Sequence, residues 1–542
     1  MKKVTLSCLL LVLAAASFAQ LQRPKLVVGI VVDQMRWDYL YRYYNRFGND
    51  GFKRLLGEGF SCGNTLINYL PSYTAVGHTT IFTGSVPSID GIAGNDWRIQ
   101  ATGKTTYCTD DSTVSTVGAP GNAGKMSPHN LWVTTVTDEL RLATNFQSKV
   151  VGISLKDRAS ILPAGHNPTG AYWLDDASGN FITSTYYTKE LPVWVNDFNK
   201  DKNIDKLIAN GWNTLLPINQ YTESTQDNEP WEGKYKGVAT PAFPYDFKNI
   251  YAANKESLRA SPFGNALTLQ FAEAAVAGEQ LGQDDQTDFL TINCASTDYT
   301  GHQFGPNSIE VEDVYLRLDK SLGEFLSYLD NKVGKGNYMV FLTADHGAAH
   351  AEGFMEANKM PTGFSRNLTA SLNQYLQSKF GEARLVLGLD NDAVSFDNNL
   401  IASKGLDKEK IKQAAIGFLQ QQPQILYAVD EAKAAEASVP QPLRDMIVNG
   451  YNRQRTGDVK FILQSGFLPE SVKTGTTHGL WNPYDTHIPL LFYGWKIPHG
   501  ESNATVYMTD IAPTVAALLH IQMPDGCIGK PIVAITDKVN GK

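Results

Sequence analysis

The chain has 542 residues, of which 42% are hydrophobic and 19% are charged, and its formal net charge is −8. This balance is typical of a globular protein, and the negative charge argues against a surface built for nucleic acid or for an anionic membrane. The length exceeds what one minimal core requires, so we expect one large domain with long insertions.

The N-terminus has the layout of a secretory signal. Two lysines precede a mostly apolar run from Val4 to Ala16, and small residues follow at Ser17 and Ala19. The run is shorter than the roughly 20 residues that span a membrane. We therefore expect a signal peptide over residues 1–19, cleavage after Ala19, and export to the periplasm or beyond.

Export would place the mature chain in an oxidising compartment, where cysteines form disulfides. Cleavage removes Cys8 and leaves Cys62, Cys108, Cys294 and Cys527. Four cysteines allow three pairings. Because Cys294 lies in an apolar, strand-like run typical of a buried thiol, our first choice is a bridge between Cys62 and Cys108.

Apolar runs rich in β-branched residues predict strands that are buried on both faces. They span residues 25–33, 149–155, 288–296, 338–345 and 488–494. Helix-like stretches lie between or after them, at residues 265–277, 309–331 and 508–519. This alternation predicts an α/β fold, a three-layer sandwich with a largely parallel central sheet.

Two long segments break this alternation. Residues 165–261 are rich in aromatic residues, Asn, Asp and Pro, which predicts a loop-rich insertion over the active face. Residues 360–468 mix helix-like and strand-like runs and predict a small α+β insertion. We expect a catalytic domain over residues 20–542 that carries both insertions.

Metal-binding side chains follow the predicted strands. Asp33, Asp298 and Asp345 lie at or just past the carboxyl ends of strands, which is where α/β sheets bind ligands. His346 is adjacent to Asp345, and His302 follows Asp298 at a spacing that puts both on one side of a helical turn. Mixed carboxylates and imidazoles suit zinc, although manganese or iron can occupy similar sites.

Thr74 precedes the helix-like run AVGHTTIFTG, and His487 precedes the apolar run IPLLFYG. A hydroxyl at a helix N-terminus lies where free N–H groups and the helix dipole favour an anion, although a lone threonine there is more often a helix cap. Cleavage of a phosphate or sulfate ester uses two cations about 4 Å apart. Together these residues predict a two-metal hydrolase with Thr74 as nucleophile.

The order of these motifs resembles the alkaline phosphatase and nucleotide pyrophosphatase/phosphodiesterase superfamily. The resemblance implies an alkaline-phosphatase-like fold, two zinc ions per chain and a covalent phosphothreonine intermediate. The ligands that it implies are Asp298, His302 and His487 for one zinc, and Asp33, Asp345, His346 and the Thr74 oxygen for the other.

Two further motifs, GNDW at 94–97 and SLKDRA at 154–159, resemble the phosphate-irrepressible bacterial alkaline phosphatases that have a threonine nucleophile. By that resemblance, Asn95, Lys156 and Arg158 bind the non-bridging phosphate oxygens. A monoester dianion carries more negative charge than a diester, so two cations at positions i and i+2 favour it. We therefore predict hydrolysis of phosphate monoesters, with inorganic phosphate as product and inhibitor.

Several alternatives stay open. A phosphodiesterase or nucleotide pyrophosphatase would use the same metals, but Lys156 and Arg158 argue against it. A sulfatase would carry C/S-x-P-x-R at the nucleophile, where this chain has SYTAVGH. A non-catalytic zinc- or phosphate-binding protein is the remaining alternative.

We expect no nucleic-acid partner and no membrane span, and the oligomeric state is open, with a monomer as one possibility. Three histidines either orient the ligands or only pack: His78, His350 and His478.

Overall fold

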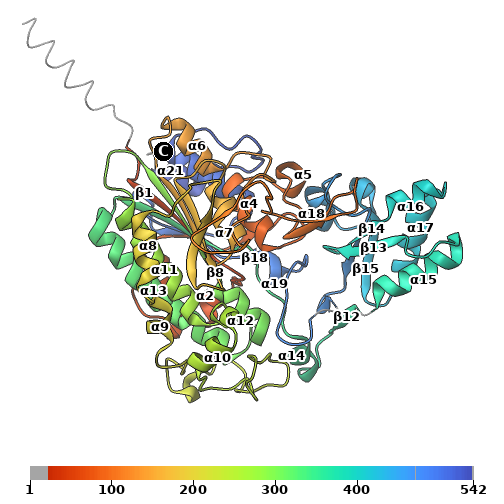
Figure 1. Ribbon diagram of the computed structural model, residues 1–542, viewed down its shortest axis with the longest axis horizontal. Coiled ribbons are helices and arrows are strands. Elements are labelled where there is room, and N and C mark those ends of the chain that lie inside the picture. The colour runs from red at the N-terminus through yellow and green to blue at the C-terminus, as the bar shows by residue number, and fades with distance from the viewer. Residues whose placement is uncertain (1–21, 366, 470–471, 540–542) are drawn as a thin grey trace, which may run out of the picture.

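The computed structural model describes residues 22–365, 367–469 and 472–539, so the predicted signal peptide lies outside the described residues. A body built around a large sheet carries a smaller lobe that projects to one side (Figure 1). Within the described residues, we find no helix with both the length and the apolar character of a membrane span.

The body is organised by a ten-stranded sheet. From edge to edge its strands are β20 (Gly500–Ser502), β2 (Phe60–Cys62), β19 (Leu490–Gly494), β11 (Tyr338–Thr343), β1 (Leu26–Val32), β10 (Asp288–Cys294), β7 (Val150–Ser154), β8 (Gly170–Asp175), β9 (Asn180–Ser184) and β6 (Thr116–Val117). The five strands from β11 to β8 are parallel, and β19 joins β11 in the antiparallel direction. The central strands are buried along their whole length, as their apolar runs require. The predicted α/β fold with a largely parallel sheet is confirmed.

Helices pack on both faces of this sheet (Figure 1). One layer contains α11 (Pro262–Gly278) and α13 (Ile309–Leu329), and α12 (Ser296–Phe304) packs against both. The other layer contains α4 (Thr74–Thr83), α7 (Asp157–Ala164) and α20 (Ile511–Leu519). The helices α4, α7 and α12 begin near the carboxyl ends of the parallel strands, so their first turns face the same edge of the sheet.

The segment predicted as a loop-rich insertion from residue 165 has a different start. Strands β8 and β9 belong to the main sheet, because their apolar and aromatic side chains are buried there. Long loops and short helices follow, namely α8 (Val193–Lys200), α9 (Asn203–Ile208) and α10 (Phe247–Ala253). The insertion boundary at residue 165 is therefore wrong, and the loop-rich segment comprises residues 185–261.

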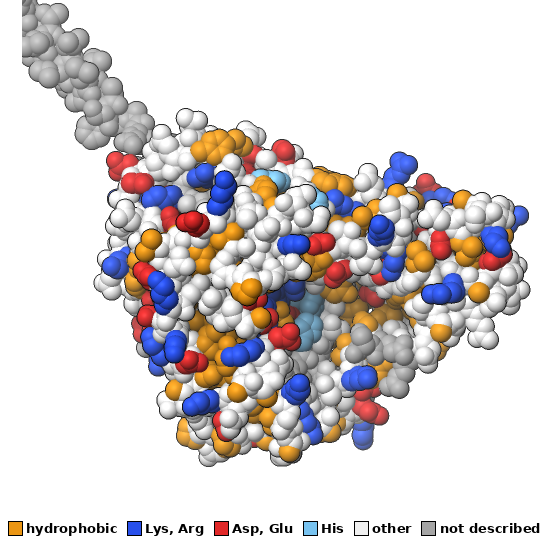
Figure 2. Space-filling view, viewed as in Figure 1, with side chains coloured by type: hydrophobic (Ala, Val, Ile, Leu, Met, Phe, Trp, Pro, Cys, Tyr) orange, Lys and Arg blue, Asp and Glu red, His pale blue; other side chains and the backbone are white. Residues whose placement is uncertain are grey.

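The projecting lobe has its own sheet and its own core. The antiparallel strands, in spatial order, are β13 (Val386–Asp390), β14 (Ala393–Phe396), β16 (Val459–Leu463) and β15 (Ile425–Asp430). Two helices cover the sheet, α15 (Leu368–Phe380) and α17 (Lys408–Leu419), and their apolar residues form a separate buried cluster with it. A recess with histidine side chains in it lies between the body and the lobe (Figure 2).

The cysteines of the described residues are free thiols, and three of the four are buried. Cys62 ends β2 in the main core, whereas Cys108 packs with Trp97 and Ala75 in a separate apolar cluster. The predicted Cys62–Cys108 bridge is therefore wrong.

Candidate metal and phosphate site

Three predicted ligands meet at the carboxyl ends of the neighbouring strands β1 and β11. Asp33 directly follows β1, and Asp345 and His346 follow β11. One ligand atom from each lies within 4.8 Å of the others, and all three residues are buried. We call Asp33, Asp345 and His346 the strand-end group. Its geometry follows from the parallel pairing of β1 with β11, which brings the two strand ends to one edge.

A second group lies beside it. Asp298 is in the first turn of α12, with its Oδ1 3.1 Å from Nε2 of His302 and 3.7 Å from Nε2 of His478. The His478 ring also stacks on that of His346, with centroids 3.4 Å apart. We call Asp298, His302 and His478 the helix–loop group. Its atoms lie close enough to His346 for the two groups to form one continuous site.

His487 is not part of this group, which corrects the predicted ligand set. Its Nε2 lies 3.0 Å from the carbonyl oxygen of Gly63, and its ring stacks on Trp37 with centroids 4.6 Å apart. His487 begins the short strand β18 (His487–Ile488), whose pairing with β3 (Thr65–Leu66) holds it in this position. His478 lies beside Asp298, in the position predicted for His487.

The three histidines of the two groups are oriented in the same way. Each donates an Nδ1–H bond to a backbone carbonyl, which leaves the Nε2 lone pair directed at the carboxylates. The acceptors are Thr476 at 2.9 Å, Gly347 at 3.0 Å and Ser72 at 2.8 Å for His302, His346 and His478 respectively. Imidazoles held in this way are typical of metal ligands.

Burial makes the site strongly electrostatic. Burial, and next the charge of Asp345, raise the pKa of Asp33 well above its ordinary value. Burial also acts to raise the pKa of Asp298, but the charges of His302 and Lys156 outweigh it and hold that pKa well below its ordinary value. Among the described residues, Asp33 Oδ1 accepts no hydrogen bond, and Asp345 Oδ2 accepts none of good geometry, because His78 Nδ1, 3.3 Å from it, donates to the Thr74 carbonyl instead. Buried anionic oxygens without a partner are costly, so the donor set and its unpaired oxygens fit a divalent cation.

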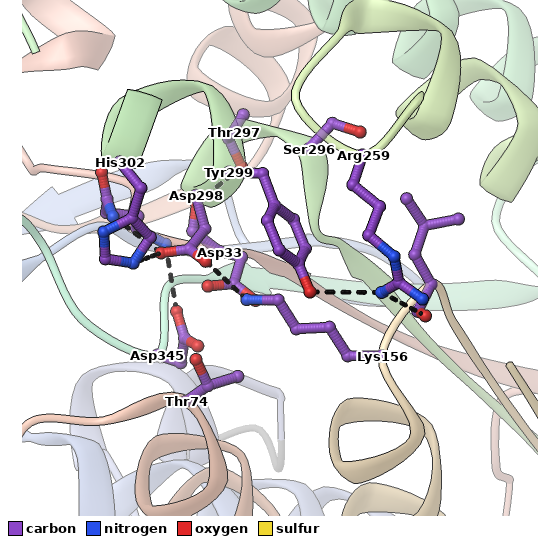
Figure 3. Close-up of polar contacts among 12 residues, drawn as sticks. Asp33, Thr74, Lys156, Arg259, Ser296, Thr297, Asp298, Tyr299, His302 and Asp345 are labelled. Atoms are coloured by element: carbon purple, nitrogen blue, oxygen red, sulfur yellow. Dashed lines mark hydrogen bonds and ion pairs between the residues drawn. The ribbon is translucent and has the colours of Figure 1, made fainter. Parts of the chain in front are cut away.

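Lys156 connects the two groups. Its side chain is almost fully buried, and Nζ lies 2.8 Å from Asp33 Oδ2 and 2.7 Å from Asp298 Oδ2 (Figure 3). Burial acts against the charged form, but the charges of Asp298 and Asp33 outweigh it and raise the pKa of Lys156. The lysine therefore brings a permanent positive charge into the centre of the site.

The other predicted residues lie around this centre. Thr74 is the first residue of α4, and its Oγ1 is 3.4 Å from His346 Nε2. Asn95 accepts a 2.9 Å hydrogen bond from the backbone N–H of Ala75, which holds it against the first turn of the same helix. Arg158, in the first turn of α7, donates a 3.0 Å hydrogen bond to the Tyr107 hydroxyl. Thr74 thus contacts the strand-end group, whereas Asn95 and Arg158 have partners outside both ligand groups.

Two residues beyond the predicted set hold the ligands in place. Gln34 donates from its backbone N–H to Asp345 Oδ1 at 3.2 Å and from Nε2 to Asp298 Oδ1 at 2.7 Å, so it links both groups. His78 donates from Nδ1 to the Thr74 carbonyl at 2.8 Å and lies 3.3 Å from Asp345 Oδ2. The only sequence signal for Gln34 is its position next to Asp33. For His78, the sequence left both an orienting role and a packing role open.

His350, the third ambiguous histidine, lies apart from both ligand groups. Its Nδ1 is 2.7 Å from Asn307 Oδ1, and its ring stacks on Phe354. The surroundings of His350 therefore favour the packing role.

A family model described as type I phosphodiesterase / nucleotide pyrophosphatase matches residues 27–481, so the chain belongs to this family of the alkaline phosphatase superfamily. It is 59% identical over 516 residues, 95% of this chain and 94% of the relative, to alkaline phosphatase PafA of Elizabethkingia meningoseptica. It is 53% identical over 511 residues, 94% of this chain and 92% of the relative, to alkaline phosphatase PhoV of Synechococcus elongatus. A crystal structure of wild-type PafA has a TM-score of 0.94 at 58% identity and covers 95% of this chain and 99% of that chain.

Proposed function

We propose that this chain is an exported, zinc-dependent alkaline phosphatase that hydrolyses phosphate monoesters through a phosphothreonine formed at Thr74. The chain is a phosphoric monoester hydrolase by its identity to PafA and PhoV over nearly its whole length. One observation supports the zinc-dependent, phosphothreonine mechanism in particular. Thr74, Lys156 and the two ligand groups meet at one edge of the sheet.

Each ligand group would hold one zinc ion. The strand-end group would use Asp33, Asp345 and His346, and the helix–loop group Asp298, His302 and His478. When bound, the ions would supply positive charge to the attacking and leaving oxygens of the ester. The mixture of carboxylates and Nε2-directed imidazoles supports zinc.

Thr74 is suited to the nucleophilic role. Its place at the start of α4 puts its hydroxyl at the positive end of a helix dipole, which favours the deprotonated oxygen. Thr74 would release its hydroxyl proton to solvent, and its oxygen would attack phosphorus and form an O–P bond while the ester O–P bond breaks. The departing alkoxide would take up a proton from solvent. Water would then cleave the phosphothreonine and release inorganic phosphate.

The charge around Thr74 favours a monoester. Lys156 would contact the non-bridging oxygens together with Arg158 and the Asn95 amide, and a dianion gains more from two cations than a diester monoanion does. The same groups would bind free phosphate, so we expect product inhibition at millimolar phosphate. Unchanged initial rates after addition of millimolar phosphate would contradict the predicted product inhibition.

Export is supported by the sequence of residues 1–19, with its lysines, apolar run and small residues. Cleavage of this segment would leave a chain that begins close to Leu26, the first residue of β1. N-terminal sequencing of the protein secreted by a host that exports it should read from Gln20.

The test compares kcat/KM for p-nitrophenyl phosphate and bis-p-nitrophenyl phosphate, using zinc-loaded protein without residues 1–19. We expect a monoester preference of roughly 100-fold or more, and loss of both activities in Thr74→Ala. A diester preference would overturn the phosphomonoesterase assignment. Binding of phosphate by a protein that hydrolyses neither ester would favour the non-catalytic binding protein.

A further inference from the structure

Tyr299, which directly follows Asp298 in α12, lies against Lys156. Its ring centroid is 4.8 Å from Lys156 Nζ, within the range of a cation–π attraction. The ring runs alongside the lysine side chain, and its hydroxyl points away from the carboxylates toward Arg259 (Figure 3). The ammonium of Lys156 thus has an aromatic partner in addition to Asp33 and Asp298.

Arg259 anchors this arrangement from behind. Its Nη1 donates to the Tyr299 hydroxyl at 3.2 Å and to the Leu155 carbonyl at 2.8 Å, and Leu155 immediately precedes Lys156. Its Nε contacts both oxygens of Asp176, at 2.8 and 3.0 Å, and its Nη2 donates to the Leu174 carbonyl at 3.2 Å. One guanidinium therefore fixes both the backbone from which Lys156 extends and the ring that its ammonium contacts.

This anchoring matters because lysine has a long, flexible stem with high rotamer entropy. Under the proposed function, Asp33 and Asp298 would also bind zinc, and zinc would weaken their electrostatic attraction for the Lys156 ammonium. The Tyr299 ring is neutral and is no metal ligand, so zinc binding would leave its contact with Lys156 unchanged. A charge held in place before the substrate arrives stabilises the transition state without the cost of reordering.

We propose that Tyr299 and Arg259 are positioning residues that set Lys156 for phosphate binding. The proposal rests on the phosphate-binding role of Lys156 under the proposed function. The loop-rich segment would then contribute to phosphate binding through Arg259, which lies near its end, directly after the short helix η3 (Lys255–Leu258). Neither residue touches the reacting atoms, so both act through Lys156.

The experiment is a double-mutant cycle on phosphate affinity, measured by calorimetry with zinc-loaded protein and inorganic phosphate. We expect Tyr299→Leu to weaken phosphate binding about tenfold, and Tyr299→Phe, which keeps the ring, to weaken it about threefold or less. In a Lys156→Ala background, Tyr299→Leu should change the affinity by less than about twofold, because its partner is gone. Equal weakening in both backgrounds would overturn the proposal.

Steady-state rates give a second readout that a structural role would not produce. Tyr299→Leu should lower kcat/KM for p-nitrophenyl phosphate about tenfold and leave that for the diester within about twofold, because the diester relies less on the lysine charge. An equal fall for both substrates would contradict positioning through Lys156.

Arg259→Gln has a matched control in Arg317→Gln. Arg317 donates from Nε to Asp313 and from Nη2 to the Asn213 carbonyl, both at 2.6 Å, so it also anchors the loop-rich segment but does so away from Lys156. Only Arg259→Gln should weaken phosphate binding. Similar weakening in both variants would refute the proposal in favour of general loosening of the segment.

Failure of the proposed function would look different. Wild-type protein that binds phosphate but does not hydrolyse p-nitrophenyl phosphate would refute that function, yet the affinity cycle would still decide the role of Tyr299. Wild-type protein that hydrolyses the monoester but gives an additive cycle would refute the positioning role alone.

Discussion

The two ligand groups share one site but are assembled differently. The strand-end group lies on β1 and β11, which are neighbours in the sheet, so the parallel pairing of two buried strands fixes it. The helix–loop group joins the first turn of α12 to the loop that carries Thr476 and His478, through the hydrogen bond from His302 to the Thr476 carbonyl. Both groups join segments that are distant in the chain, but in the first group every ligand follows an apolar strand run, whereas His478 of the second lies in a loop that no such run precedes.

The groups also differ in charge. The strand-end group has two carboxylates and one imidazole, and the helix–loop group has one carboxylate and two imidazoles. The pKa of Asp33 is raised by burial and by Asp345, whereas the pKa of His302 is raised because Asp298 outweighs its burial. The strand-end group therefore has the greater need for a cation.

The largest effect is expected from breaking the strand-end group. Asp345→Asn removes one of its two negative charges, and we expect kcat for p-nitrophenyl phosphate to fall roughly a thousandfold with loss of one bound metal. Metal content by mass spectrometry and steady-state rates check this. Asp319→Asn is the control, because Asp319 is also buried but accepts hydrogen bonds from the backbone of Gly48 and Phe52. Asp345→Asn protein with full metal content and activity within tenfold of wild type would contradict the assignment.

The helix–loop group is tested by comparing His478, which belongs to it, with His487, which was predicted from the sequence. His478→Ala removes a group beside Asp298, and we expect about a hundredfold loss of activity and weaker zinc binding. His487→Ala should cost about threefold or less, because His487 contacts Gly63 and Trp37 instead. Zinc titration of the two variants provides the measurement. A larger loss in His487→Ala would restore the original ligand set.

Metal removal should destabilise the protein. Both groups bury carboxylates whose charge a cation would compensate, and a ligand that binds only the folded state stabilises it by mass action. We expect chelation to lower Tm by roughly 5–10 °C, and the shift should be smaller in Asp345→Asn. Identical melting curves with and without chelator would mean that the buried groups are satisfied without metal.

A reference pair away from the site should give the smallest effect. His166 Nδ1 donates to Asp138 Oδ2 at 2.9 Å, and His166 Nε2 donates to the Leu131 carbonyl at 3.1 Å, so both ring nitrogens of His166 are paired. Burial opposes protonation of His166, but the Asp138 hydrogen bond and charge outweigh it and raise the pKa of His166. The same partner holds the pKa of Asp138 below its ordinary value, against the effect of burial.

The sign of the pH dependence follows from these shifts. The His166 contribution is fully present below its unfolded pKa of about 6.5 and is lost as the pH rises through the raised folded value. The Asp138 contribution is fully present above its unfolded pKa of about 3.9 and is lost as the pH falls through the lowered folded value. Because the histidine side chain is 35% exposed, we expect His166→Gln to cost less than about 1 kcal/mol at pH 5.5 and less still at pH 8.5. Urea unfolding at both values measures this, and a larger cost at pH 8.5 would reverse the assigned sign.

Much of the fold and the strand-end group could be predicted from sequence, because their signals are local. The runs that became β1, β7, β10 and β11 are largely apolar, and Asp33 and Asp345 follow where β1 and β11 end. Strands β8 and β9 were missed because aromatic residues mixed with Asn and Asp are typical of loops. Their place in the sheet follows from the pairing of β8 with β7 and of β9 with β8.

The helix–loop group was only partly predictable. The segment HGLWNPYDTH contains both His478 and His487, and residue type does not distinguish a ligand from a ring stacked on Trp37. The distinction depends on the backbone path that brings His478 Nδ1 to the Ser72 carbonyl, a contact between residues far apart in the chain. The disulfide was mispredicted for a related reason, since cysteine count and export do not determine which thiols are close.

We expect the two neighbouring ligand groups to hold two metal ions for phosphomonoester hydrolysis. Stepwise zinc addition to chelated protein, with bound metal and p-nitrophenyl phosphate hydrolysis followed together, tests it most directly. Two zinc ions per chain are expected at saturation, with full activity only when both are bound. One ion or none at full activity, or activity that persists in chelator, would contradict it.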